Sequence, residues 1–494
     1  MNRYRVIFIG IDGATPKLIE EFFKEKKLPN LLLFQKEGIL GNLQSSIPPL
    51  SPVAWTSMFC GVNPGKHGIY GFVKIQPGTD QMKPVTAHDR KAKAIWEILS
   101  RRGYKTIVIN VPITYPPDPI NGIMISGLGT PSISSNFMFP PSIRSSFLKE
   151  HPNYKIDFNE ELFRLDGDKN SLLKRINLAQ KIRWQIVTDY LKTKEWDLFI
   201  VVFRFLDVVQ HFFWNERDIL LKFYQKIDQI LGLIINYLTD NITLMIASDH
   251  GFEEVKWQFH LNNWLEQQNY LKYLSIRPMG KFVGRIGLKP ENIQKIMLKL
   301  GLRGIVWRIK HSKYTSHVLS QISPQRSIFN IDWEKTRAFY VPGSNHMIDI
   351  NPYYSWESSD EKEHFITELL EKLRKIKDSN LNYRLMQDVF RKNVVYSGKH
   401  VDTLPEFVLI PNKGFELFGE EHLRGLFRKP KQAAVNRPAS HNMTGIFGVF
   451  GSSIKPKRLN ANLLDIAPSI LNLLNTPIPK YFDGKSFIPK ITKQ

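Results

Sequence analysis

RVIFIGID (residues 5–12) is an apolar, β-branched run that ends in an aspartate, and ITLMIASD (242–249) repeats this pattern far along the chain. Two similar runs lie between them, KTIVINV (105–111) and DLFIVVF (197–203). Each run is short and nearly all apolar, as expected for a strand that is buried on both faces. We therefore predict four core strands, with Asp12 and Asp249 at the ends of two of them.

Amphipathic segments separate these runs. The clearest are KAKAIWEILSRRG (91–103) and LKFYQKIDQILGLIINYL (221–238), where apolar residues recur at helical spacing. Strands that alternate with helices predict an α/β fold with a mostly parallel central sheet and helices on both faces. Ligands of such sheets gather at the carboxyl ends of the strands.

The pattern loosens after residue 254, where we predict an inserted, smaller, cap-like lobe over 255–435. It contains a basic stretch (280–328) and three expected strands: TRAFYV (336–341), MIDI (347–350) and EFVLI (406–410). The core pattern returns with GIFGVFG (445–451) and the apolar helix LLDIAPSILNLLN (463–475). The expected catalytic core therefore comprises residues 1–254 and 436–494.

The composition is that of a globular protein, with 494 residues, 42% of them hydrophobic and 23% charged. The single cysteine, Cys60, excludes an internal disulfide and favours a reducing compartment. No uninterrupted apolar run approaches the roughly 20 residues that a membrane-spanning helix requires. We expect a cytoplasmic protein without a transmembrane segment; its oligomeric state is open.

The formal net charge of +22 favours anionic partners, namely phosphorylated small molecules, nucleic acid or an acidic membrane surface. The basic residues are scattered through short segments such as KEKK (24–27) and RKPK (428–431). No nucleic-acid module is recognised among them. Charge alone therefore does not choose among these partners.

Several short motifs carry residue types suited to phosphoryl chemistry. Ser51 lies in a proline-rich loop within IPPLSPVAWTSMFCGVNPGKHGIYGF (47–72), and Asp207 and His211 are four apart in RFLDVVQHFFW (204–214). Two residues at that spacing share a helix face and can grip one cation. Each motif alone is more often a capped helix, an exposed pair or an ordinary turn.

Two further histidines complete the set. Asp249 and His250 follow a strand, and both can reach one ion only if the chain leaves strand geometry, which Gly251 would permit. His441 stands in a polar loop before a returning strand and says little by itself.

Together these motifs resemble the type I phosphodiesterase and nucleotide pyrophosphatase branch of the alkaline phosphatase superfamily. The resemblance rests on their order: IGIDG, PPLSPVAWTS…GVNPGKHGI, D-x-x-x-H, SDHG, a late histidine before GIFGVFG, and DIAPSILNLLNTPIPKYFDGKSF (465–487). It implies two divalent metal ions. The implied ligands are, for the first ion, Asp12, Ser51, Asp249 and His250, and for the second, Asp207, His211 and His441.

Carboxylate and imidazole ligands suit zinc or manganese. Two ions about 4 Å apart can stabilise the attacking and leaving oxygens of an in-line displacement. The expected reaction is hydrolysis of a phosphodiester or nucleotide pyrophosphate through a covalent phosphoserine at Ser51.

Some positions depart from the family pattern. Relatives that cleave nucleotides commonly have a threonine nucleophile and a later asparagine, where this chain has Ser51 and Phe72. Many carry a basic residue after the aspartate of D-x-x-x-H, where this chain has Val208. Lys66 or Arg437 could supply the missing phosphate contact. Nucleotide specificity is therefore left open.

Other activities compete with this interpretation. A phosphomonoesterase or a phosphomutase could use the same metal core, although no phosphate-transfer lobe is recognised. A sulfatase needs a Cys or Ser followed by x-Pro-x-Arg, which neither Ser51 nor Cys60 offers. The alternative of another class is a non-catalytic binder of nucleic acid or acidic membrane. All seven ligand positions hold competent residue types, which favours the enzyme.

Overall fold

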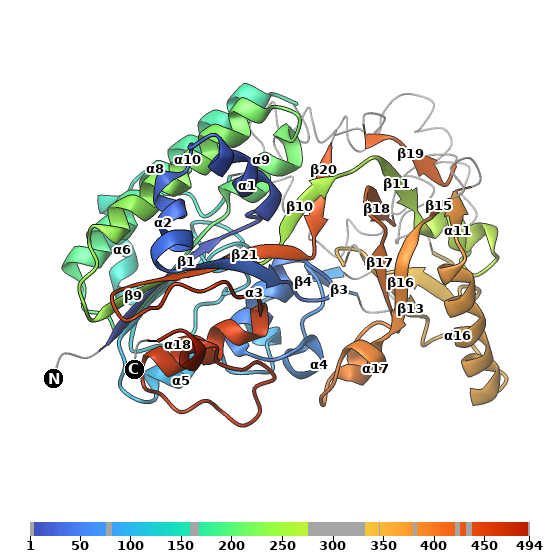
Figure 1. Ribbon diagram of the computed structural model, residues 1–494. Helices are drawn as coiled ribbons and strands as arrows, with labels where there is room; N and C mark the ends of the chain where they lie inside the picture. The colour runs from blue at the N-terminus through green and yellow to red at the C-terminus, as the bar shows by residue number, and fades with distance from the viewer. Residues whose placement is uncertain are drawn as a thin grey trace.

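The computed structural model describes residues 4–75, 82–158, 167–274, 331–344, 346–378, 383–419, 425–430 and 437–492. Within these ranges a nine-stranded sheet runs through the molecule in the order β22-β2-β21-β9-β1-β8-β5-β6-β7 (Figure 1). Its strands are β1 (Arg5–Ile11), β2 (Ile39–Gln44), β5 (Thr106–Ile109), β6 (Gly122–Ile125), β7 (Met138–Phe139), β8 (Leu198–Phe203), β9 (Ile242–Ala247), β21 (Thr444–Phe450) and β22 (Ala461–Asn462).

The middle of the sheet is parallel. Strand β1 pairs in parallel with β8 and β9, and β5 pairs in parallel with β8 and β6. The four runs predicted as core strands are β1, β5, β8 and β9, and all residues of β8 and β9 are buried. Antiparallel strands occur towards the edges, where β21 pairs with both β9 and β2.

Helices cover both faces of this sheet, which confirms the predicted α/β fold (Figure 1). One apolar cluster packs under helices of the first face, and a second packs under those of the other. The first face carries α1 (Pro16–Lys24), α2 (Pro29–Glu37), α8 (Lys169–Thr193), α9 (Phe205–Phe213) and α10 (Arg217–Ile235). The other carries α3 (Ser51–Cys60), α5 (Ile95–Ser100) and α18 (Ile466–Leu473).

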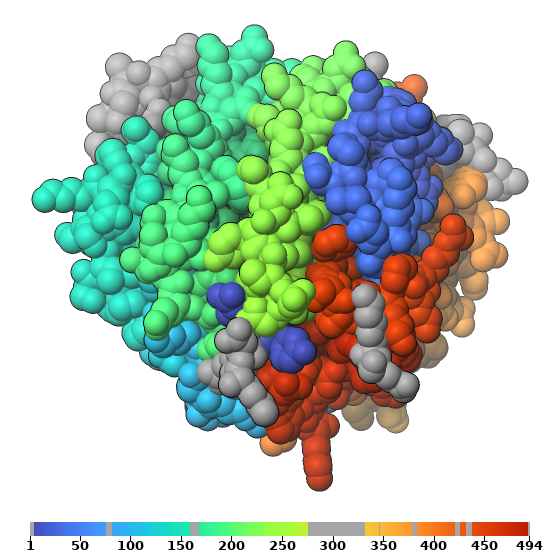
Figure 2. Space-filling model, turned by 60° about the vertical axis from the view of Figure 1, so that its left-hand side comes forward, coloured from blue at the N-terminus to red at the C-terminus, as the bar shows by residue number. Residues whose placement is uncertain are grey.

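The first face brings distant parts of the chain together. Figure 2 shows the N-terminal helices beside the green segment that contains α10 and above the C-terminal segment. Asp228 of α10 accepts hydrogen bonds from the backbone N–H groups of Asn30 and Leu31 at the start of α2. In the described ranges, no helix is long and apolar enough to cross a membrane.

The residues of the predicted lobe form separate small sheets with an apolar cluster of their own. The three expected strands are present as β12 (Ala338–Tyr340), β13 (Met347–Ile350) and β17 (Phe407–Pro411), which join β16 (Met386–Arg391) under α16 (Ser359–Arg374). A second sheet contains β11 (Trp257–His260), β18 (Phe415–Phe418) and β19 (Phe427–Arg428). The basic stretch 280–328 lies outside the described residues, and the boundaries at 254 and 436 stay predictions.

Candidate metal and phosphoester site

All seven predicted ligand side chains lie at the carboxyl edge of the parallel strands. Asp12 follows β1, and Asp249 and His250 follow the neighbouring β9, with Gly10 of β1 opposite Ala247 of β9. Asp207 and His211 lie on α9, which begins just after β8, so the predicted helix is present. Ser51 begins α3, and His441 lies on β20 (Ala439–Asn442). The ends of neighbouring strands therefore position these residues close together at one edge of the sheet.

The turn after β9 lets consecutive residues face the same site. The chain leaves β9 at Ala247 and resumes at Gly251 as β10 (Gly251–Glu254), which pairs antiparallel with β20. A Cβ atom on Gly251 would lie 2.1 Å from the carbonyl oxygen of Thr444. The glycine is thus needed because another backbone approaches closely; it begins β10, and the turn itself is made by residues 248–250.

A second glycine fixes the Asp249 carboxylate. Gly13 has a φ of +78°, and a Cβ there would lie 2.7 Å from the Phe252 ring. Its N–H donates to Oδ1 of Asp249 at 3.2 Å. The loop is held in turn by Gln210 of α9, whose amide donates to the Gly13 carbonyl at 2.7 Å.

The ligand atoms form two overlapping groups. One contains Asp207, His211 and His441, whose ligand atoms all lie within 4.8 Å of one another. The other contains Asp12, Asp207 and His250 within the same limit. Asp249 Oδ2 and Ser51 Oγ lie 3.2 and 3.3 Å from Nε2 of His250. The structure thus brings all seven residues together.

Two buried carboxylate oxygens in this cluster have no hydrogen-bond donor among the described residues. Asp12 and Asp249 are fully buried, yet Oδ1 of Asp12 and Oδ2 of Asp249 find no hydrogen-bond donor in the described part of the chain. A buried acceptor without a donor is costly. Both atoms face the ring of His250. These vacant lone pairs suit a cation.

The electrostatics agree with this. Burial, followed by repulsion from Asp249 and Asp207, raises the pKa of Asp12 well above its ordinary value. Burial and the charge of Asp207 raise the pKa of Asp249 to about 7. Burial would also raise the pKa of Asp207, but the neighbouring histidines and Arg204 hold it well below its ordinary value. Carboxylates that repel one another in a buried cluster call for positive charge.

The three histidines are suited to bind a cation because their rings are neutral. Burial lowers the pKa of His250 to about 4, and burial together with the charge of Arg437 lowers the pKa of His211 well below its ordinary value. Burial, and then His250, lowers the pKa of His441. Neutral imidazole is the form that ligates metals. The donor set therefore fits divalent metal, with Asp, His and the Ser51 hydroxyl as the residues that would hold it.

The two residues predicted to contact phosphate lie in different surroundings. Nη2 of Arg437 is 2.8 Å from both ring nitrogens of His211, beside the cluster. The Lys66 ammonium instead pairs with Asp483 and donates to the Tyr481 carbonyl at 2.9 Å, in the C-terminal segment. The structure brings Arg437 to the ligand groups and places Lys66 with other partners.

Three residues at the site were missed from the sequence. Trp55 donates from Nε1 to Oδ2 of Asp12 at 3.2 Å, and Gln210 holds the Gly13 loop. Arg204 is buried beside the carboxylates of Asp12 and Asp207. Spacing offered a signal for Trp55, which follows Ser51 by one helical turn, and for Arg204, which lies in the turn before Asp207.

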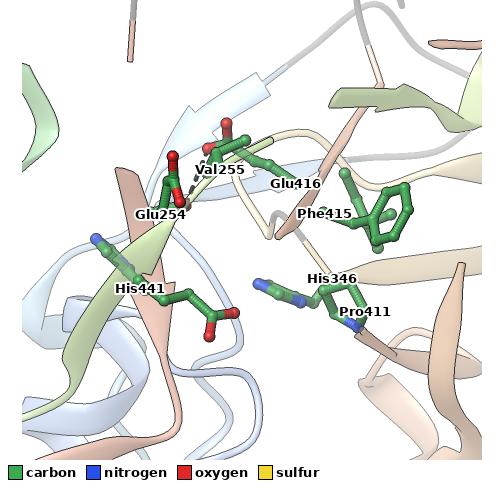
Figure 3. A pocket seen from close by; sticks show the side chains of 10 residues that line it. Glu254, Val255, His346, Pro411, Phe415, Glu416 and His441 are labelled. Carbon is green, nitrogen blue, oxygen red and sulfur yellow. Dashed lines mark hydrogen bonds between the residues drawn. The ribbon is translucent and has the colours of Figure 1, made fainter. Parts of the chain in front are cut away.

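The predicted lobe contacts the site at the antiparallel pair of strands β10 and β20. His441 and Phe252 oppose each other in this pair, and Glu253 opposes Ser440. A small cavity lies there; its lining includes His441 of the core and His346 and Glu416 of the lobe (Figure 3). The Ser440 hydroxyl donates to Glu416 at 2.9 Å, which ties the strand that carries His441 to the lobe.

A model of the family described as type I phosphodiesterase / nucleotide pyrophosphatase matches residues 6–446. The chain belongs to this family. It is therefore a phosphoric ester hydrolase of a metal-dependent family, as the sequence predicts. The match spans all seven ligand positions, with His441 near its end, so the whole candidate site lies within it.

Solved structures share the fold at low sequence identity. Human ectonucleotide pyrophosphatase / phosphodiesterase 5 is 13% identical, with a TM-score of 0.54 and coverage of 99% of this chain and 100% of that one. Phosphonoacetate hydrolase from Sinorhizobium meliloti 1021, in complex with phosphonoformate, is 14% identical, with a TM-score of 0.60 and 96% of each chain covered. At such identities the likeness shows the fold alone. No curated protein sequence matches the chain.

Proposed function

We propose that this family member hydrolyses phosphodiesters or nucleotide pyrophosphates through a covalent phosphoserine at Ser51. The observation that carries the proposal is the position of that hydroxyl. Ser51 is 3% exposed, begins α3, and places Oγ 3.3 Å from Nε2 of His250, beside the vacant carboxylate oxygens of Asp12 and Asp249. A nucleophile beside a cation-binding cluster is what phosphoryl transfer requires.

The chain's own groups supply much of the chemistry. The first turn of α3 carries a partial positive charge that favours both an anionic phosphoryl group and a deprotonating Ser51. We propose that the Arg437 guanidinium, which lies next to His211, would hold a non-bridging phosphate oxygen. Two bound divalent ions, which we propose to be zinc or manganese, would supply Lewis acidity for the nucleophile and the leaving oxygen.

The reaction then has two steps. Ser51 Oγ forms a bond to phosphorus as the bond to the leaving alcohol or phosphate oxygen breaks, and the proton that the Ser51 hydroxyl gives up ends on that leaving oxygen. Water next cleaves the Oγ–phosphorus bond from the vacated side, which restores the serine and releases the phosphate product.

The test compares two serines of the same helix. Chelator-treated protein, resupplied with Zn²⁺ or Mn²⁺, is assayed with bis(p-nitrophenyl) phosphate and p-nitrophenyl phosphate, as wild type, Ser51→Ala and Ser57→Ala. Ser57 is a matched control because it is also buried in α3 and also hydrogen-bonds a histidine, at 2.7 Å from His67.

We expect metal-dependent turnover with the diester preferred, a loss of at least about 10³-fold in Ser51→Ala, and retained turnover in Ser57→Ala. A phosphorylated peptide containing Ser51, trapped by acid quench and found by mass spectrometry, would establish the intermediate. Equal turnover by wild type and Ser51→Ala would overturn the nucleophile assignment. Preference for the monoester would instead favour a phosphatase.

A further inference from the structure

Arg204 lies between the two groups of ligands. Its side chain is 7% exposed, with Nε 3.8 Å from Oδ2 of Asp12 and Nη2 3.4 Å from Oδ2 of Asp207. The guanidinium therefore faces one carboxylate from each implied metal position. Nothing in the proposed reaction assigns it a part.

The contacts divide the oxygens of both carboxylates in the same way. Oδ2 of Asp12 faces Arg204 and accepts from Trp55, whereas Oδ1 faces Nε2 of His250 at 3.7 Å. Oδ2 of Asp207 faces Arg204, whereas Oδ1 lies 3.2 Å from Nε2 of His441. In each carboxylate, one oxygen faces the arginine and the other faces the ligand histidines.

Arg204 is itself held from a different part of the chain. Its Nη1 donates to Oδ1 of Asp157 at 2.6 Å. Helix α8 grips the backbone on either side of that aspartate: Arg183 donates to the Ile156 carbonyl at 2.9 Å, and Arg175 donates to the Phe158 carbonyl at 3.3 Å. Asp157 is thus anchored to a long helix of the core.

We propose that Arg204 is a positioning residue for metal binding, which hydrogen-bonds Oδ2 of Asp207, attracts Oδ2 of Asp12 as an ion pair at 3.8 Å, and so keeps Oδ1 of each carboxylate turned to the histidines. Outer partners of this kind fix the orientation of ligating carboxylates. The inference rests on the metal sites of the proposed function and adds a residue to them. Asp157, anchored by α8, fixes the guanidinium plane.

The experiment measures metal affinity without turnover. Full-length, chelator-treated protein is titrated with Co²⁺, followed by its visible absorption, and Zn²⁺ then displaces the Co²⁺. We expect Arg204→Lys and Arg204→Met to bind about 10- to 100-fold more weakly than wild type. The lysine variant is decisive because an ammonium keeps the charge but lacks the planar fork that faces several carboxylates at once.

Arg90→Lys is the matched control. Arg90 has the same 7% side-chain exposure and contacts Glu97 and Asp118 at 2.7 Å, away from the ligand groups, so Co²⁺ affinity should be unchanged. Circular dichroism and Tm of each metal-free variant report folding. If Arg204→Met fails to fold, Asp157→Asn keeps the arginine and removes its anchor, with an expected weakening of about threefold to tenfold.

The outcomes separate the two claims. If Arg204→Lys binds as wild type and Arg204→Met binds more tightly, Arg204 acts only as a repelling charge and the positioning role is wrong. Unchanged affinity in every Arg204 and Asp157 variant also overturns it, while the proposed function stands. Wild type that binds no metal overturns the proposed function itself, and the inference with it.

Discussion

Helix α3 carries a serine–histidine pair at each end, and the two pairs differ in their surroundings. At its start, Ser51 lies 3.3 Å from His250, beside one oxygen each of Asp12 and Asp249 that has no hydrogen-bond donor among the described residues. Near its end, Ser57 lies 2.7 Å from Nε2 of His67, whose Nδ1 accepts the N–H of Ile69 at 3.1 Å. Each side-chain nitrogen and oxygen of the second pair has a hydrogen-bond partner.

We interpret this difference as one between a proposed binding site and a pair that only stabilises the fold. In the second pair, Nδ1 of His67 accepts a hydrogen bond from the Ile69 N–H. In a neutral ring the hydrogen is then on Nε2, which donates to Ser57 Oγ. Both ring nitrogens of His67 are therefore used, and neither is left for a ligand. The first pair is open, because Asp12 and Asp249 add acceptors without adding donors. Buried acceptors without donors, more than the residue types, distinguish the proposed functional end of the helix from the other.

The largest effect should come from Asp249→Asn compared with Asp228→Asn. Both aspartates are buried with a raised pKa, but Asp228 accepts from the Leu31 N–H at 2.7 Å and the Asn30 amide at 2.8 Å. We expect Asp249→Asn to lose at least about 10³-fold in diester hydrolysis and to raise the Tm of the metal-free protein, because one mutually repelling charge is gone. Asp228→Asn should keep activity and lower Tm.

Thermal unfolding with and without Zn²⁺ measures the effect of these substitutions on stability. Wild type should gain about 3 kcal/mol of stability at 100 times the metal Kd, and Asp249→Asn should gain much less. A metal-free Asp249→Asn protein that is less stable than wild type would contradict the idea that the cluster is strained without its cations.

The sequence predicted the parts of this comparison that depend on local pattern. The core strands were recognisable because parallel strands buried on both faces read as continuous apolar runs, as in β8 and β9. All seven ligand positions were named, although their roles stay predictions. Helix α8 was missed because its many lysines and polar residues dilute the apolar stripe. Asp157 could not be found, because its partner Arg204 is distant in sequence and only the folded chain joins them.

The second effect is the pH dependence of stability that comes from His67 of the Ser57–His67 pair. Burial lowers the pKa of His67 from 6.5 to about 3 in the folded protein. A depressed pKa means that the folded state keeps the ring neutral while the unfolded state takes up a proton, so stability is complete above pH 6.5 and falls as the pH falls towards 3. Between pH 7 and 5, His67 should account for about 2 kcal/mol of lost stability.

Urea unfolding of wild type and His67→Gln at the two pH values isolates this contribution from that of the other buried histidines. The variant should lose about 2 kcal/mol less than wild type over the same interval. Parallel losses in the two proteins would show that His67 is not kept neutral by the fold, and the Ser57–His67 pair would no longer differ from the open one in this respect.

A further effect of similar or smaller size should be that of Ser57→Ala on stability. Removing the hydroxyl leaves the Nε2 hydrogen of His67 without its acceptor in a fully buried position, which should cost about 1 to 3 kcal/mol in urea unfolding. Ser51→Ala should cost less in metal-free protein, because the Ser51 hydroxyl lies in an open cluster at a longer distance from its histidine. The two variants would then show opposite rankings, Ser57 leading in stability and Ser51 in activity. If Ser51→Ala were the more destabilising variant, Ser51 would contribute more to stability than Ser57. The proposed contrast between the two serine–histidine pairs would then be wrong.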